Sequence, residues 1–145
     1  MEVQEVMSSY VHTVEQDESV AAAARKMREG DVGSLVVTSS GSVKGVITDR
    51  DLTVRCMSQG HDYQKCRVSD HMGGPAITVG PASDMLDAAA MMAGRKIRRL
   101  PVVDGDKLIG LVSLSDIALS IDSALVSMNS TLHDLLSGMG AARST

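Results

Sequence analysis

The strongest constraint on the fold is a pattern that the chain contains twice. Gly45-Val46-Ile47-Thr48 is followed by Asp51, and 65 positions later Gly110-Leu111-Val112-Ser113 is followed by Asp116 in the same frame. Each copy has a glycine, an apolar pair, a hydroxyl residue and then an aspartate three positions on. This order predicts a buried strand that ends where a helix begins. We therefore expect polar side chains at two equivalent strand-to-helix corners.

The duplication extends well beyond these corners. Val3 to Leu52 aligns without a gap on Val68 to Ile117 at the same offset, which indicates two copies of one structural unit. The segment Gly60 to Cys66 is polar and has no apolar period, so it connects the copies. The chain then divides into a first repeat over 1–60, a connection over 61–67, a second repeat over 68–128, and a C-terminal helix with a loose tail over 129–145.

Local signals in the first copy predict a helix, two strands and a second helix. Asp17-Glu18-Ser19 supplies capping residues for a helix over about 19–29, which Gly30 ends. Two β-rich runs, over about 33–38 and 43–48, flank a turn of hairpin composition. The second helix runs from about Asp49 to Gln59.

The second copy repeats this order with its own signals. Pro81-Ala82-Ser83-Asp84 opens its first helix, and Asp104-Gly105-Asp106 forms the turn between its strands. Pro101 has no N–H to donate, which indicates an edge position or a strand start.

After Asp116 a helical pattern continues toward the C terminus. Asn129-Ser130-Thr131 is a candidate break between two helices, with Ser130 or Thr131 capping the second. Gly138 to Thr145 is rich in small residues and is expected to be loose. The apolar positions that recur at helical spacing are Ile117, Ile121, Ala124, Leu125, Met128, Leu132, Leu135 and Leu136.

The composition is that of a folded, soluble domain. Hydrophobic residues make up 43% and charged residues 22%, while Phe and Trp are absent and ten Met help to fill the core. The net charge of −4 and the lack of stacking side chains argue against binding of nucleic acid. No apolar run approaches the roughly 20 residues that span a bilayer, and the N terminus lacks a basic secretory start. We therefore expect a cytoplasmic protein without a membrane partner.

Four residues that can ligate metals recur at steps of five: Cys56, His61, Cys66 and His71. A helix places positions i and i+5 on different faces, and structural zinc sites use closer pairs. We therefore expect no metal site, and we expect the cysteines to be reduced thiols rather than a disulfide framework. His12 and His133 have no acid or nucleophile near them in any motif, so no catalytic residue is predicted.

Two copies of strand, helix, strand, strand and helix, each closing with the corner pattern, resemble the CBS-domain family over Val3 to about Ala124. In particular, Arg98 to Asp104 followed by Gly110 to Asp116 is similar to the second half of a CBS pair. The layout is similar to that of small stand-alone two-CBS proteins, in which no catalytic domain is attached. The resemblance implies an α/β (α+β) fold in which two tandem β-α-β-β-α repeats pack by their sheets into a pseudo-two-fold Bateman module.

The resemblance also implies two clefts that hold AMP, ADP, ATP, NAD or S-adenosylmethionine. By the matching motif positions, Asp116 would take the ribose hydroxyls and Ser113 would face the ribose or phosphate, and Asp51 and Thr48 would do so in the other cleft. The chemistry is suitable, because a carboxylate offers two acceptors to a diol and a helix N terminus favours phosphate. The candidate ligand-binding residues are Arg99, Ser113, Asp116, Arg98, Ile97, Thr48, Asp51, Val32, Ser34, Thr13 and Thr78.

A structural role competes with each of these assignments. Thr48 with Asp51, and Ser113 with Asp116, also have the spacing of helix capping boxes. The clefts differ in charge as well, since Arg98-Arg99 stands where the first copy has Gly33-Ser34. Neighbouring strand residues point to opposite faces, and by resemblance Arg99 is the one that enters the cleft as a phosphate partner. The alternative is a solvated basic strand edge.

The functional prediction is a regulatory module that senses an adenosyl ligand, requires no cofactor and is not an enzyme. The alternative is a ligand-free module for dimerisation or interaction with another protein. An enzyme is a weaker hypothesis, because neither copy has a nucleophile elbow, a phosphate-binding glycine loop or a metal signature. We expect a homodimer, because the helices carry apolar residues for a shared face. Those residues are Ala22, Met27, Met91, Met92, Ile117 and Leu125.

Overall fold

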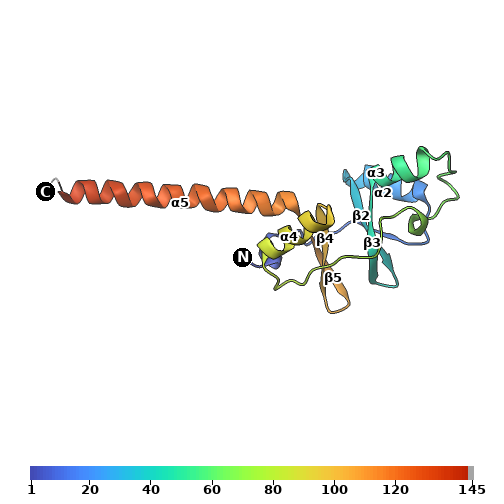
Figure 1. The fold of residues 1–145 in the computed structure, drawn as a ribbon, viewed down its shortest axis with the longest axis horizontal. Coiled ribbons are helices and arrows are strands. Elements are labelled where there is room, and N and C mark those ends of the chain that lie inside the picture. Colours follow the sequence, from blue (N-terminus) through green and yellow to red (C-terminus); the bar gives the residue numbers. More distant parts are fainter. Residues whose placement is uncertain (144–145) are drawn as a thin grey trace.

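The computed structural model describes residues 1–143 as an α+β body of two small sheets from which one long helix projects (Figure 1). The predicted fold class is confirmed. The two repeats follow each other along the chain with a matching order of elements, except that the first strand of the first repeat has no full counterpart in the second. The strand-to-helix corners lie where the duplicated pattern placed them.

The first repeat contains a three-stranded sheet with the order β1-β2-β3. β1 pairs parallel with β2, and β2 pairs antiparallel with β3. Ser40 and Gly41 both have positive φ, which suits the tight turn between β2 and β3. The elements are α1 (Val3–Val6), β1 (Thr13–Glu15), α2 (Val20–Gly30), β2 (Ser34–Ser39), β3 (Ser42–Thr48), α3 (Asp49–Asp51) and the π-helix η1 (Leu52–Met57).

The second repeat contains a two-stranded antiparallel sheet. Its strands have the same lengths as β2 and β3, and a register shift interrupts both hairpins at equivalent positions, after Val37 and after Val102. The elements are the 3-10 helix η2 (Val68–Asp70), α4 (Met85–Arg95), β4 (Arg99–Asp104), β5 (Lys107–Ser113) and α5 (Leu114–Arg143).

The third strand of the second sheet is reduced to a single bridge, and Pro101 explains why. In the first repeat, Val36 N donates to His12 O at 3.0 Å and helps to hold β1. Pro101 occupies the position equivalent to Val36 and has no N–H. The strand that would correspond to β1 therefore keeps only the parallel bridge from Val79 to Val102. The expectation of an edge position for Pro101 agrees with this arrangement.

The equivalent helices α2 and α4 begin as predicted, but α2 ends one residue later than predicted. Ser19 accepts a hydrogen bond from Ala22 N and caps α2, and Asp84 caps α4. The expected stop at Gly30 is wrong in detail, because Gly30 is still helical and the left-handed cap residue is Asp31, with φ of 51°. Lys96 takes the equivalent position after α4, with φ of 56°. A non-glycine residue there carries a strain of about 1 kcal/mol.

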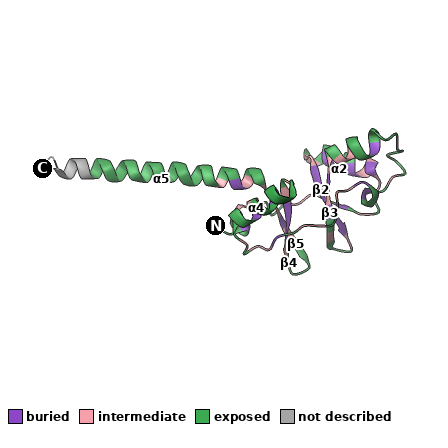
Figure 2. Ribbon diagram, viewed as in Figure 1, coloured by how far each residue is buried: buried purple, intermediate pink, exposed green. Residues whose placement is uncertain are grey.

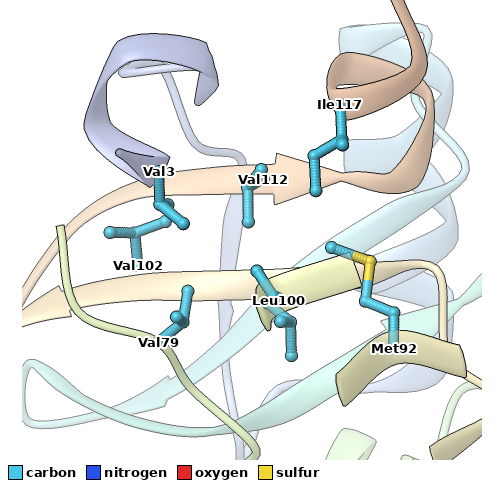
Figure 3. Close-up of a cluster of buried hydrophobic side chains, with 8 residues drawn as sticks. Val3, Val79, Met92, Leu100, Val102, Val112 and Ile117 are labelled. Atoms are coloured by element: carbon cyan, nitrogen blue, oxygen red, sulfur yellow. The ribbon is translucent and has the colours of Figure 1, made fainter. Parts of the chain in front are cut away.

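The core of each repeat includes a residue from the start of the other repeat. Val3, in α1, is fully buried among second-repeat residues that include Val79, Val102 and Val112 (Figure 3). Val68, in η2, is fully buried in the cluster of the first repeat. The packing therefore crosses the division into 1–60 and 68–128, which stays a prediction from the sequence alone.

The glycine that leads each corner pattern makes room for this exchange. Ser8 and Leu111 exchange two backbone hydrogen bonds, at 2.9 and 3.0 Å, so the segment after α1 lies directly against β5. A Cβ at Gly110 would stand 2.8 Å from Ser8 O, closer than real Cβ contacts allow. Gly45 lies in the same way beneath Met72.

α5 is one continuous helix of 30 residues, so the predicted break at Asn129-Ser130-Thr131 is wrong. Thr131 Oγ1 donates to Ser127 O at 3.0 Å, which satisfies the hydroxyl within the helix instead of in a cap. The segment expected to be loose is helical from Gly138 to Arg143, and residues 144–145 lie outside the described chain. Figure 2 shows that α5 is exposed along most of its length. Along residues 1–143, no helix has both the length and the apolar character needed to cross a bilayer.

Candidate functional site

The second strand-to-helix corner is a closed capping box. Ser113 ends β5, and its backbone N–H donates to Asp116 Oδ2 at 3.0 Å. Asp116 N donates in return to Ser113 Oγ at 3.0 Å. Leu114 N donates to Arg98 O at 2.9 Å, which joins the start of α5 to the start of β4. These bonds fix both polar side chains at the N terminus of a long helix.

The first corner has the same geometry. Thr48 N donates to Asp51 Oδ2 at 2.9 Å, and Asp51 N donates to Thr48 Oγ1 at 3.2 Å. Asp49 N donates to Gly33 O at 2.9 Å, in the role that Leu114 N has in the second repeat. Both predicted capping roles are therefore present, each stabilising its helix by about 1 kcal/mol.

The strand residue opposite the corner hydroxyl is cationic only in the second repeat. Arg99 lies directly opposite Ser113 in the antiparallel pair, so the two side chains share one face of the sheet. In the first repeat the equivalent pair is Ser34 and Thr48, and Ser34 is buried. Arg99 is half-buried and so can present its guanidinium to a ligand while its stem packs on the sheet.

The two aspartates differ in what remains open to a ligand. Asp51 Oδ1 lies 3.4 Å from Arg55 Nε, and its Oδ2 is held by the capping box, so both oxygens have protein partners. Asp116 uses Oδ2 for its capping box, and no residue of the described chain donates to its Oδ1. The carboxylate of Asp116 is thus the more available acceptor.

The other predicted residues fall into two groups. Val32 and Ile97 are half-buried and pack against the first and second cores, respectively. Thr13, Thr78 and Arg98 are exposed. Thr13 is the first residue of β1, and Thr78 precedes the bridge at Val79. Only Thr13 belongs to a strand, and no hydrogen bond or salt bridge joins any of these five residues to Asp51 or Asp116.

A shallow hollow of about 460 Å³ lies on one side of Asp116. It is formed between α1 and the first turns of α5, and Glu5 and Asp116 give its lining a negative charge. This charge would repel a phosphate. The face that suits a phosphate is therefore the one that Arg99 and Ser113 share, and neither of these residues lines the hollow.

The structure also brings together a set of side chains that the spacing argument had set aside. Cys56, Cys66 and His71 each direct a ligand atom to within 4.8 Å of the others. A continuous regular helix would place these residues on different faces. The chain instead leaves η1 after Met57 and folds back along the first repeat. The sequence signal was the repeated Cys and His spacing itself, and only the tertiary fold shows that the residues converge.

Comparison with known proteins gives one consistent result. The profile of the CBS domain matches residues 3–57 and 68–123. The CBS domain-containing protein YhcV of Bacillus subtilis is 37% identical over 118 residues, which is 81% of this chain and 84% of that protein.

Solved structures agree with the sequence comparison. Hypoxic response protein 1, known from Mycobacterium tuberculosis and solved with two coordinated zinc ions, superposes with a TM-score of 0.75 at 26% identity, over 83% of this chain and 98% of that chain. A CBS domain pair solved in complex with 5′-methylthioadenosine and S-adenosyl-L-methionine gives 0.76 at 22% identity, over 86% and 98% of the two chains.

Proposed function

Because the chain belongs to the CBS-domain family, we propose that it is a regulatory module that binds an adenosyl ligand at its strand-to-helix corners and catalyses no reaction itself. The observation that carries the proposal is the grouping of Arg99, Ser113 and Asp116 at the second corner. A solved protein of the same fold holds two adenosyl compounds, which supports the ligand class.

The second corner suits a ligand with a phosphate. Asp116 Oδ1 can accept from a ribose hydroxyl while Oδ2 keeps the capping box intact. Arg99 offers a planar pair of donors to phosphate, and the N terminus of the 30-residue α5 adds positive potential. Ser113 Oγ accepts from Asp116 N and keeps its own hydroxyl hydrogen, which it can donate to a ribose or phosphate oxygen. AMP, ADP, ATP and NAD all contain the required ribose and phosphate.

The first corner suits a less charged ligand, or none. Ser34 replaces the arginine, and Arg55 competes with a ribose for the Asp51 carboxylate. A neutral or cationic adenosyl compound such as S-adenosylmethionine needs no phosphate partner. We therefore expect the two corners to prefer different ligands. A ligand can change the conformation of the module only if it binds one conformation more tightly than another.

Calorimetry on variants of the two aspartates tests this proposal. After a thermal-shift panel identifies the ligand, Asp116→Ala and Arg99→Ala should each weaken nucleotide binding by about 1.5–3 kcal/mol, roughly ten- to a hundredfold. Asp51→Ala should change nucleotide affinity less. Asp106→Ala, in the exposed turn before β5, is the matched control. Full affinity in Asp116→Ala together with loss in Asp51→Ala would reverse the assignment, and no shift with any adenosyl compound would reject it.

A second function, self-association through α5, is favoured by the exposed apolar side chains of that helix. The homodimer was expected from helix faces that include Met27, Met92 and Ile117, but these three are buried in the cores. The apolar surface lies on α5 instead, where Leu125 is 58% exposed and Leu135 is 60% exposed. The steps between successive apolar positions alternate between three and four residues at Ala118, Ile121, Leu125, Met128, Leu132 and Leu135.

This spacing is that of a coiled-coil seam, which fits a second copy of the same helix. We therefore propose a homodimer whose two α5 helices pack along this seam. Light scattering should give a dimer for the wild type and a monomer for Leu125→Glu, because a charge in the seam loses its apolar partner. Ser123→Glu, exposed on the same helix, is the control. A dimeric Leu125→Glu would contradict the proposed seam.

A further inference from the structure

Two cysteines and a histidine converge at the end of the first repeat. Cys56 Sγ, Cys66 Sγ and a ring nitrogen of His71 all lie within 4.8 Å of one another. With Zn–S near 2.3 Å and Zn–N near 2.0–2.1 Å, the ligand atoms of a tetrahedral zinc ion are about 3.3–3.8 Å apart. Small side-chain adjustments therefore bring the three atoms to coordination distance.

Backbone hydrogen bonds hold each ligand in place. Cys56 lies in η1, and His61 N donates to Cys56 O at 3.1 Å, so the chain closes over the helix end. Cys66 O accepts from Val20 N at 2.9 Å, which fastens the connection to the first turn of α2. His71 follows η2, and its N–H donates to Val68 O at 3.0 Å. Three separate segments thus deliver one ligand each.

The histidine has the surroundings of a metal ligand. Its Nδ1 lies 3.1 Å from Arg67 O, a contact that requires the proton on Nδ1 and leaves the Nε2 lone pair either to accept from His61 Nδ1 or to bind a metal. His61 Nδ1 lies 3.1 Å from this Nε2, close to the separation of two nitrogen ligands on one ion. His61 is exposed, so its ring can turn toward an ion without disturbing the core.

Two of the three converging side chains lie in the interior of the protein, shielded from water. Cys56 and His71 are 1% and 4% exposed. A divalent cation at this point would neutralise the thiolates of Cys56 and Cys66, whose sulfur atoms lie side by side. Two sulfur and two imidazole ligands in a tetrahedral arrangement select zinc.

We propose that Cys56, Cys66 and His71, with His61 as the fourth ligand, bind one zinc ion that fastens the connection to the first repeat. The ion would join η1, the connection and η2. It would therefore hold the connection against the first repeat and stabilise the fold. The site is separate from both strand-to-helix corners and does not depend on the adenosyl proposal.

Metal titration of the reduced, metal-free chain tests the proposal. Competition with a chromophoric chelator should show uptake of one Zn²⁺ per chain, and Co²⁺ should give the charge-transfer absorption of thiolate coordination. Cys56→Ser, Cys66→Ser and His71→Asn should each lower the zinc affinity by roughly a hundredfold or more, because each removes one of four ligands. His61→Asn should lower it as well. His133→Asn, on exposed α5, is the control and should bind as wild type.

Circular dichroism of each metal-free variant separates ligand loss from misfolding, and zinc should raise the unfolding temperature of the wild type but not of Cys66→Ser. Wild-type affinity in Cys66→Ser or His71→Asn would overturn the site, and wild-type affinity in His61→Asn would overturn the fourth ligand. Absence of zinc uptake by the reduced chain, with a Cys56–Cys66 disulfide on oxidation, would overturn the proposal entirely.

Discussion

Replacing Val3 with alanine should destabilise the whole module, although Val3 lies at the beginning of the chain. The side chain is fully buried in the core of the second repeat. α1 is also held there by the hydrogen bonds from Val3 N to Ser83 O, at 2.8 Å, and from Gln4 N to Pro81 O, at 3.0 Å. Removing two carbons loses about 1.6 kcal/mol of apolar burial, and the cavity left behind raises the loss to about 2–3 kcal/mol.

Urea unfolding followed by circular dichroism measures this loss. With a slope of about 2 kcal/mol per molar urea, the midpoint should fall by roughly 1–1.5 M. We expect a single transition, because Val3 links the first repeat to the second core and Val68 links the second repeat to the first core. The matched control is Val54→Ala, whose side chain is 43% exposed, and its change should stay within about 0.5 kcal/mol.

Two outcomes would refute this reasoning. A midpoint unchanged in Val3→Ala would show that α1 does not contribute to the second core in solution. Two separate transitions, of which only one moves, would show that the repeats unfold independently despite the exchange of Val3 and Val68.

Three further predictions concern single positions. Asp31→Gly should raise the free energy of unfolding by about 0.5–1 kcal/mol, measured by urea unfolding, because glycine adopts the left-handed φ of 51° without strain. A decrease would show that the Asp31 side chain stabilises the fold by more than the backbone strain costs. Burial raises the pKa of the Cys56 thiol in the folded state, so the protonated thiol stabilises the fold fully below the pKa of the unfolded state, and this stabilisation is lost as the pH rises through the pKa of the folded state. The metal-free wild type should therefore lose more free energy of unfolding in alkaline buffer than Cys56→Ala. Parallel pH profiles of the two proteins would contradict this. Pro101→Val restores a backbone donor at the position equivalent to Val36, and hydrogen exchange should show a protected amide at position 101; rapid exchange of that amide would contradict the role given to Pro101.

The duplicated pattern predicted much of the fold because it combines signals of several kinds. The strand-to-helix corners and their capping boxes follow from short local spacing, and both are present with the predicted partners. Strand alternation allowed only one of Arg98 and Arg99 to enter the cleft, the family resemblance selected Arg99, and the hairpin register then shows Arg99 opposite Ser113. Local chemistry determines these features, so the sequence shows them directly.

Features that depend on distant parts of the chain were not predicted. α1 and η2 are too short to show an apolar period, so nothing in their sequence assigns Val3 and Val68 to the opposite cores. The π-winding of η1 and the return of the chain onto α2 bring Cys56 and Cys66 together, and neither has a local signal. The Thr131 hydroxyl donates to a carbonyl within the helix, and the sequence pattern of a helix cap is the same whether the hydroxyl bonds in this way or caps a new helix.

The crossed packing of α1 and η2 also bears on how such a chain can arise. A polypeptide with a single repeat would begin with a segment such as α1, whose valine packs into the core of another repeat. Its own core would need the same segment from a second molecule, so two such chains would have to exchange their N-terminal segments. Joining two repeats on one chain turns that intermolecular exchange into an internal one, at an effective concentration in the millimolar range. The connection over 61–67 keeps the two repeats at this concentration, and a chain cut there should give two pieces that reassemble on mixing.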